Sequence, residues 1–299
     1  MLRAGGLVAI PTETVYGLAA DAANPAAIAR LYAVKARPAD HPSIVHLASA
    51  DDARLWAATW PEAAESLARR FWPGPLTLIL PAGDRAAPSA LGGTGTIGLR
   101  VPDHPLALAV LAAARTGLAA PSANRFGRVS PTTAEHVAND LGRDVDLVLD
   151  GGACAVGVES TIVDLSGEAP RLLRPGRITA EEVEATLTMP LAAVDASAPR
   201  APGTLAAHYA PRLPVVVVED PATIADPGST TLIAPTGVRP PGFHAVIDAG
   251  ATPDAYAARV YALLRAADMS GAARIACVPP APTGVGIAVR DRLRRAAAS

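Results

Sequence analysis

The first 187 residues alternate between short apolar runs and segments with helical spacing, and this alternation constrains the fold more than any other feature. Such an order of elements is typical of an α/β domain, in which helices pack on a sheet. The apolar runs predict strands at 7–10, 44–47, 76–80, 97–101, 118–120, 147–149, 161–165 and 171–173. Helices are predicted from 25 to about 38 and over 62–71, 105–114, 133–141 and 179–187.

The pattern stops between residues 188 and 214, where five prolines occur among alanine and serine. This composition predicts a semi-rigid linker. A second unit begins with four consecutive valines at 215–218, a run typical of a buried strand in a parallel sheet. Strands at 230–233 and 274–278, and helices at 253–267 and through 290–295, complete a βαβ-like pattern. We therefore expect a domain over 1–187, a linker over 188–214 and a smaller α/β domain over 215–299.

Charge and cysteine content exclude several classes of protein. Residues 1–187 carry a net charge of −4 and residues 188–299 one of +2, which disfavours a protein that grips nucleic-acid phosphates. The four arginines between 290 and 295 are predicted to form a solvated helix face. Two cysteines, Cys154 and Cys277, lie far apart, so we expect a reduced cytoplasmic protein without a disulfide scaffold or a metal site. No apolar run is long enough to predict a signal peptide or a membrane span.

Several common motifs can be rejected. The string G-T-G-T-I-G at 93–98 matches a dinucleotide-binding pattern, but it continues into a predicted strand where that motif requires a helix. No phosphate-binding P-loop surrounds Lys35, and no G-x-S-x-G nucleophile elbow is present. His41 and His46 do not form the helical H-E-x-x-H arrangement of a metalloprotease.

Lys35 is the single lysine among 26 basic residues. In a chain that otherwise uses arginine as its cation, a lone lysine indicates a position that needs a compact ammonium group in place of a planar guanidinium. Chance retention of one lysine is the alternative. If the position is functional, Lys35→Arg is expected to abolish activity with little effect on thermal stability.

Polar segments follow or precede many of the predicted strands, where α/β sheets bind their ligands. The cations among them suit phosphate and carboxylate groups, and hydroxyl groups are available to orient a substrate. No nucleophile paired with a base is evident, so catalysis is expected to rest on positioning and electrostatic stabilisation, as in nucleotidyl transfer. The segments lie at 11–17, 35–38, 121–124, 130–132, 157–161 and 173–176.

Six of these motifs, in this order and at this spacing, resemble the threonylcarbamoyl-AMP synthase family with its YrdC-type catalytic domain. The linker and the C-terminal unit, with A-H-Y-A-P at 207–211 and A-V-R-D-R-L at 288–293, resemble the two-domain form. The resemblance implies a YrdC-like twisted sheet with packed helices and a smaller Rossmann-like α/β domain. The motifs are P-T-E-T-V-Y-G-L, K-A-R-P, P-S-A-N, S-P-T, V-E-S-T-I-V-D and L-R-P-G.

The resemblance implies an L-threonylcarbamoyladenylate synthase that converts L-threonine, bicarbonate and ATP into threonylcarbamoyl-AMP and pyrophosphate, the first step of tRNA threonylcarbamoyladenosine modification. The carbamate of threonine would attack the α-phosphate of ATP. Mg²⁺ is expected on the ATP phosphates without a dedicated protein cage. Other proteins would transfer the product to tRNA, which this chain alone is not expected to bind strongly, and no membrane is involved.

The same resemblance assigns roles to residues of each motif. Lys35, Arg37, Ser122 and Asn124 are similar to the catalytic signature of the family. The threonine side would be lined by Thr14, His46, Arg100, Ala120 and Ser160. The nucleotide would contact Arg37, His41, Thr96, Ser122, Ser130, Arg174 and the linker residue Tyr209. Tyr209 is expected to fold over the nucleotide as a lid, the alternative being an ordinary interdomain packing tyrosine.

Two other functions are weighed against this one. An RNA-binding module without turnover is disfavoured by the negative first domain and by an aromatic content of only 4%. A carbamoyltransferase with a YrdC-type domain, acting on carbamoyl phosphate, is disfavoured because the match spans both domains and no further zinc-finger cysteines are present.

Overall fold

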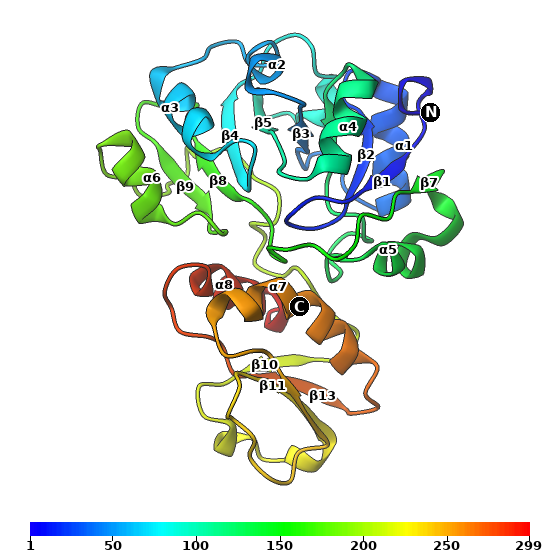
Figure 1. The fold of residues 1–299 in the computed structure, drawn as a ribbon, viewed down its shortest axis with the longest axis vertical. Helices are drawn as coiled ribbons and strands as arrows, with labels where there is room; N and C mark the ends of the chain where they lie inside the picture. The colour runs from blue at the N-terminus through cyan, green and yellow to red at the C-terminus, as the bar shows by residue number, and fades with distance from the viewer.

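The computed structural model describes residues 1–299 and contains two β-sheets, one in each half of the molecule (Figure 1). The larger sheet has nine strands in the order β7-β1-β2-β6-β3-β5-β4-β8-β9 and mixes parallel and antiparallel pairs. Its strands are β1 Val8–Ile10, β2 Gly17–Asp21, β3 Ile44–His46, β4 Leu76–Pro81, β5 Thr96–Arg100, β6 Leu118–Ala119, β7 Leu147–Val148, β8 Thr161–Asp164 and β9 Arg171–Arg174. The predicted α/β class is therefore confirmed.

Six α-helices accompany the large sheet. Five of them contribute to a core of 35 buried residues, and α4 packs on the sheet through a separate cluster of nine. Capping explains where two of them begin: the side chain of Asn24 accepts from two backbone amides of α1, and Thr179 with Glu182 forms the predicted capping box of α6. The helices are α1 Pro25–Lys35, α2 Ala50–Arg54, α3 Glu62–Phe71, α4 Pro105–Ala114, α5 Ala134–Leu141 and α6 Ala180–Leu187.

The smaller sheet is wholly parallel, in the order β10-β13-β11-β12. Its strands are β10 Val215–Val217, β11 Thr230–Ala234, β12 Ala245–Asp248 and β13 Arg274–Cys277, and its helices are α7 Pro253–Asp268 and α8 Gly286–Ala297. The valine run was predicted to be a buried strand, but β10 lies at an edge and only Val215 is buried, because the strand has a single neighbour.

Helices α7 and α8 lie between the small sheet and the first domain (Figure 1). Three valines of the first domain, Val15, Val129 and Val158, belong to the same hydrophobic cluster as the buried faces of these helices. The two domains therefore share one apolar interface. None of the helices combines the length and apolar character needed to cross a membrane.

Three elements were not predicted. Strand β2 has the sequence G-L-A-A-D, poor in β-branched residues, yet it is buried between β1 and β6 and pairs antiparallel with both. Its conformation is imposed by these neighbours, since its own propensity for strand is weak. Helix α2 spans five residues and β12 spans four, lengths too short for a clear periodic signal. The other predicted elements are present, with ends shifted by a few residues.

Candidate active site

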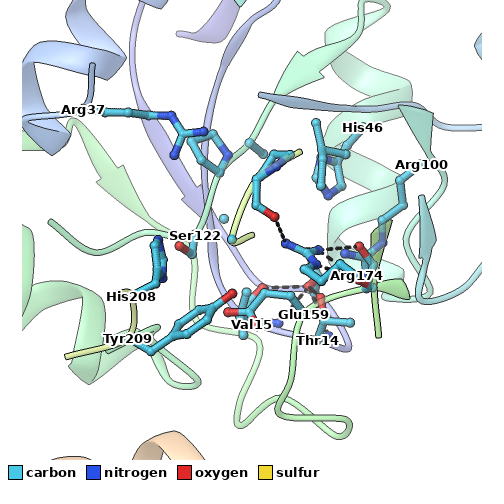
Figure 2. A pocket seen from close by; sticks show the side chains of 18 residues that line it. Thr14, Val15, Arg37, His46, Arg100, Ser122, Glu159, Arg174, His208 and Tyr209 are labelled. Atoms are coloured by element: carbon cyan, nitrogen blue, oxygen red, sulfur yellow. Dashed lines mark hydrogen bonds between the residues drawn. The ribbon is translucent and has the colours of Figure 1, made fainter. Parts of the chain in front are cut away.

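A pocket at the ends of the strands of the large sheet brings together most of the predicted site residues (Figure 2). Its wall includes all five residues assigned to threonine, namely Thr14, His46, Arg100, Ala120 and Ser160. It also includes Arg37, Ser122, Arg174 and Tyr209 from the nucleotide set. The cavity measures about 60 Å³, and the linker residues Pro202, Gly203, His208 and Tyr209 form part of its wall.

Arg100, the last residue of β5, is the main charge on one side of the pocket. Its Nη2 lies 2.7 Å from Oε1 of Glu13, and its Nε donates to the carbonyl of Gly74. Next to it, burial and the Arg100 charge lower the pKa of His46 to about 3. His46 is therefore neutral at pH 7 and its Nδ1 has no partner within the protein.

Arg174 ends β9 and ties the first domain to the linker. Its guanidinium donates to the carbonyl of Ser160 at 2.9 Å and to the Ser160 hydroxyl at 3.1 Å. Nη1 donates to the carbonyl of Pro202, a linker residue, at 2.8 Å. A buried arginine thus connects a strand end with the segment that covers it.

Tyr209 is held in a left-handed backbone conformation with φ of 65°, which is uncommon for a residue other than glycine. Its ring contacts His208, with centroids 4.1 Å apart, and stacks on Tyr261 of α7 at 5.5 Å. Its hydroxyl is buried without a partner, and burial raises its pKa to about 12, so it remains a potential hydrogen-bond donor. A Cβ at Gly203 would lie 2.4 Å from this hydroxyl, so only glycine allows the observed approach.

Glu159 precedes β8 and is the centre of a buried cluster between the domains. Its carboxylate accepts hydrogen bonds from Ser130 at 2.7 Å, from Tyr261 at 2.7 Å and from Nε of Arg292 at 2.8 Å. Desolvation opposes its charge, but Arg292 and Arg174 outweigh this effect and lower the pKa of Glu159 to about 2. Glu159 is therefore a carboxylate at pH 7.

Arg292 corrects one prediction made from the sequence. The arginines of 290–295 were expected to form a solvated face, yet Arg292 exposes none of its side chain. It lies on the same face of α8 as Val289 and Leu293, which are fully buried. Arg290 and Arg295 also form ion pairs, with Glu219 and Asp291. The interdomain carboxylate Glu159 explains why a cation occupies this face.

Lys35 and Asn124 do not line the pocket. The Lys35 ammonium is 1% exposed and donates to the carbonyls of Ser122 and Asn124, each at 2.5 Å. Burial lowers its pKa well below the usual range. Lys35 therefore supports the loop that carries Ser122. Because Lys35 is buried, the larger arginine would disturb packing, so Lys35→Arg is now expected to lower thermal stability as well as activity.

Asn124 and Arg37 complete that corner of the site. Asn124 donates from its amide nitrogen to the carbonyls of Arg125 and Arg128, while its amide oxygen is buried without a partner. Arg37 donates to the carbonyl of Pro42, and its guanidinium lies 5.7 Å from the Phe126 ring.

Three residues assigned to the nucleotide lie off the pocket wall. Ser130 is fully buried and binds Glu159. Thr96 lines a small neighbouring cavity that shares Ile44 and Pro202 with the pocket. His41 packs edge-on against Phe126, whose ring in turn contacts His208 of the linker. Their contact with a nucleotide stays a prediction.

Two carboxylates and one histidine of the pocket were not predicted as site residues. Glu13 and Glu159 occur within the quoted motifs, where a carboxylate among Ser and Thr next to a strand was the available signal. His208 adjoins Tyr209 in the linker.

No group of three or more His, Cys, Asp or Glu side chains could hold a metal ion. Since both carboxylates are already paired with arginines, the residues present do not form a protein cage for a divalent cation.

Comparisons with known proteins cover nearly the whole chain. Residues 1–176 match the Sua5/YciO/YrdC family model, described as telomere recombination, and residues 178–298 match the model described as threonylcarbamoyl-AMP synthase, C-terminal domain. Threonylcarbamoyl-AMP synthases of Pyrococcus abyssi and Bacillus subtilis are each 40% identical, over 99% of this chain and 91% of theirs. A crystal structure of P. abyssi Sua5 complexed with L-threonine superposes with a TM-score of 0.91 at 38% identity, over 99% of this chain and 92% of that one.

Proposed function

The chain belongs to the two-domain threonylcarbamoyl-AMP synthase family, and we propose that it joins L-threonine, bicarbonate and ATP in the pocket at the strand ends, releasing pyrophosphate. The observation that carries the proposal is the convergence of Arg37, Arg100 and Arg174 on one buried cavity. A site built from three cations suits a substrate set made of a carboxylate, bicarbonate and a triphosphate. The enzyme is a nucleotidyltransferase that acts in tRNA modification.

The threonine side of the pocket is formed by the Arg100 wall. The threonine carboxylate is assigned to Arg100, whose guanidinium lies on the pocket wall beside the Glu13 carboxylate. Neutral His46 and the hydroxyls of Thr14 and Ser160 orient the amino acid, while Ala120 leaves space for its methyl group. The amine attacks bicarbonate with loss of water, and the resulting carbamate oxygen then attacks the α-phosphorus of ATP.

The nucleotide side provides electrostatic stabilisation. Arg37 and Arg174 balance the charge that shifts toward the leaving pyrophosphate, and Ser122 and the Tyr209 hydroxyl donate hydrogen bonds. Lys35 holds the carbonyls of the 122–124 loop, so that Ser122 and Asn124 keep their positions during the reaction. No side chain has to form a covalent bond with substrate.

The divalent cation belongs to the substrate. Because the protein supplies no free carboxylates for it, Mg²⁺ would enter on the ATP phosphates and offset their charge. A cytoplasmic location is part of the same proposal, supported by the two buried, unpaired cysteines. Transfer of the product to tRNA requires further proteins.

The linker acts as a lid. A cavity of about 60 Å³ is far smaller than the roughly 300–1000 Å³ of ligand pockets, so ATP enters only if the linker residues Pro202 to Tyr209 move away. When the linker closes again, it excludes water from an adenylate that water would hydrolyse.

The test is pyrophosphate release by the purified protein with each substrate omitted in turn. Release that requires threonine, bicarbonate and ATP together is expected. Release that continues unchanged without threonine would show a different ATP-using reaction. A matched variant, Arg100→Lys, keeps the charge but loses bidentate pairing, so its KM for threonine should rise on the order of tenfold, while that for ATP stays close to wild type.

A further inference from the structure

Two side chains from helices of the C-terminal domain contact a residue of the pocket wall. Arg292 of α8 and Tyr261 of α7 both bind the carboxylate of Glu159, which lies on the pocket wall. Neither residue lines the pocket. Arg292 and Tyr261 can therefore affect the reaction only by positioning the residues that they contact.

Arg292 contacts all three parts of the chain at once. Its Nε donates to Glu159 and its Nη2 to the carbonyl of Pro175, two positions of the first domain, the latter directly after Arg174. Its guanidinium carbon lies 5.4 Å from the centroid of the Tyr209 ring, in the linker. Its Nη1 donates to Asp291 within α8 at 2.6 Å. A planar guanidinium can meet these partners together, whereas an ammonium group cannot.

The geometry points to Arg292 as a positioning residue: it fixes the Tyr209 ring and the Glu159 carboxylate in their catalytic orientations when the C-terminal domain is docked. Tyr209 has a strained backbone, and its ring contacts the rings of His208 and Tyr261 and this guanidinium. Without Arg292 the ring loses the contact that sets its plane. The Glu159 carboxylate would lose its hydrogen bond from Arg292 Nε, and Arg174, assigned above to the nucleotide, would be the remaining nearby cation.

This inference rests on the proposed function, and it must be separated from simple stabilisation. Replacing Arg292 alone leaves the Glu159 charge buried and unpaired, which lowers the thermal midpoint for reasons unrelated to catalysis. The double variant Arg292→Met/Glu159→Gln removes both charges and keeps side chains of similar volume, so most of the lost stability should return. The orientation of Tyr209 does not return, since methionine gives no cation to its ring.

A second interdomain ion pair provides the matched control. Arg265 of α7 forms two hydrogen bonds with Asp140 of α5, at 2.8 and 2.6 Å, and both side chains are mostly buried. This pair also joins the two domains but lies outside the pocket wall. The double variant Arg265→Met/Asp140→Asn therefore loosens docking to a similar degree without touching Tyr209 or Glu159.

The experiment measures thermal midpoint and the steady-state kinetics of threonine-dependent pyrophosphate release for the full-length proteins. We expect Arg292→Met and its double variant to lose at least about tenfold in kcat/KM for ATP. The double variant recovers its thermal midpoint but not its activity, Arg292→Lys does not restore activity, and the Arg265/Asp140 control stays within about twofold of wild type.

Two results would overturn the inference. If activity returns together with thermal stability in the Arg292→Met/Glu159→Gln protein, or if the Arg265/Asp140 control loses as much, Arg292 acts only in stability. If the wild-type protein itself shows no threonine-dependent release, the proposed function fails together with the inference built on it, an outcome distinct from the first two.

Discussion

The two domains contribute to the pocket from different parts of their folds. In the first domain the contributing residues stand at strand ends, as with Arg100 at the end of β5 and Arg174 at the end of β9. In the second domain the strand ends carry no part of the pocket, although parallel sheets usually bind ligands there. Its contribution comes from the faces of α7 and α8 that pack on the first domain.

The two domains therefore have different roles at the pocket. Strand ends of the first domain present cations and hydroxyls directly to the substrates, while the helix faces of the second domain hold the linker and Glu159 in place. Changes in the first domain should therefore remove the chemistry. Changes in the second should weaken it in proportion to how far they displace the linker.

The largest effect is expected in the first domain, from Lys35→Arg. A guanidinium does not fit where the ammonium meets two carbonyls at 2.5 Å, so the 122–124 loop must shift and activity should fall on the order of 1000-fold. Kinetics of pyrophosphate release and a thermal melt measure both consequences. Near-normal turnover would show that the lone lysine is a compositional accident.

A smaller loss is expected when residues 188–299 are deleted. The truncated protein keeps Arg37, Arg100 and Arg174 but loses Tyr209, so turnover should fall on the order of 100-fold. It also exposes Val15, Val129 and Val158, and a modest drop in thermal midpoint follows from this. Circular dichroism of the truncated protein checks folding separately from kinetics. Unchanged kinetics would show that the linker does not act as a lid.

The change of stability at acid pH can be compared for two buried histidines, one on each side of the pocket. Burial lowers the pKa of His46, on the strand side, and of His208, in the linker, to about 3 each. Both bind a proton near pH 6.5 only when the chain unfolds, so the free energy of unfolding should fall as pH decreases from 6.5 toward 3. Each histidine accounts for at most about 1.4 kcal/mol per pH unit.

Urea unfolding at pH 7.5, 6.5 and 5.5 measures this slope. His46→Gln should reduce the slope of the unfolding free energy against pH. His208→Gln should reduce it by a similar amount if the linker is closed in solution. A wild-type slope that His208→Gln leaves unchanged would indicate that the linker histidine is solvated, and hence that the lid is mainly open.

The smallest effect is expected from Arg177→Ala. Arg177 pairs with Asp254 of α7 at 2.7 Å, but both side chains are about half exposed. Exposed pairs contribute little, so the free energy of unfolding should change by less than about 0.5 kcal/mol, with kinetics unaltered. A large kinetic effect would mean that any interdomain contact controls the pocket, which contradicts the special place of Arg292.

Much of the first domain could be predicted because its signals are local. Alternating runs marked the strands, and polar segments beside them marked Arg100, Ser160 and Arg174. The missed strand β2 shows the limit, since its G-L-A-A-D sequence becomes a strand only between its neighbours. Placement of Lys35 behind the pocket wall also depends on contacts with residues almost 90 positions away.

The burial of Arg292 could not be predicted from the residues next to it in the sequence. The R-D-R-L-R-R run has the composition of a solvated helix, but position 292 lies in the stripe formed by Ala288, Val289, Leu293 and Ala296. An arginine within such a stripe needs a buried anion opposite, and that anion, Glu159, lies in the other domain. The helical spacing of residue 292 indicated a buried position, whereas its partner Glu159 could be identified only from the tertiary structure.

The dependence of the pocket on α8 has a consequence for how the protein is made. Domains fold as units during synthesis, the N-terminal one first, so the cations at the strand ends are in place while the ribosome is still adding the linker. Arg292 is the last residue of the Glu159 cluster to be translated. The strand-end cations of a nascent chain therefore form before the helix that orders the linker, and full turnover is expected only after α8 has been translated and docked.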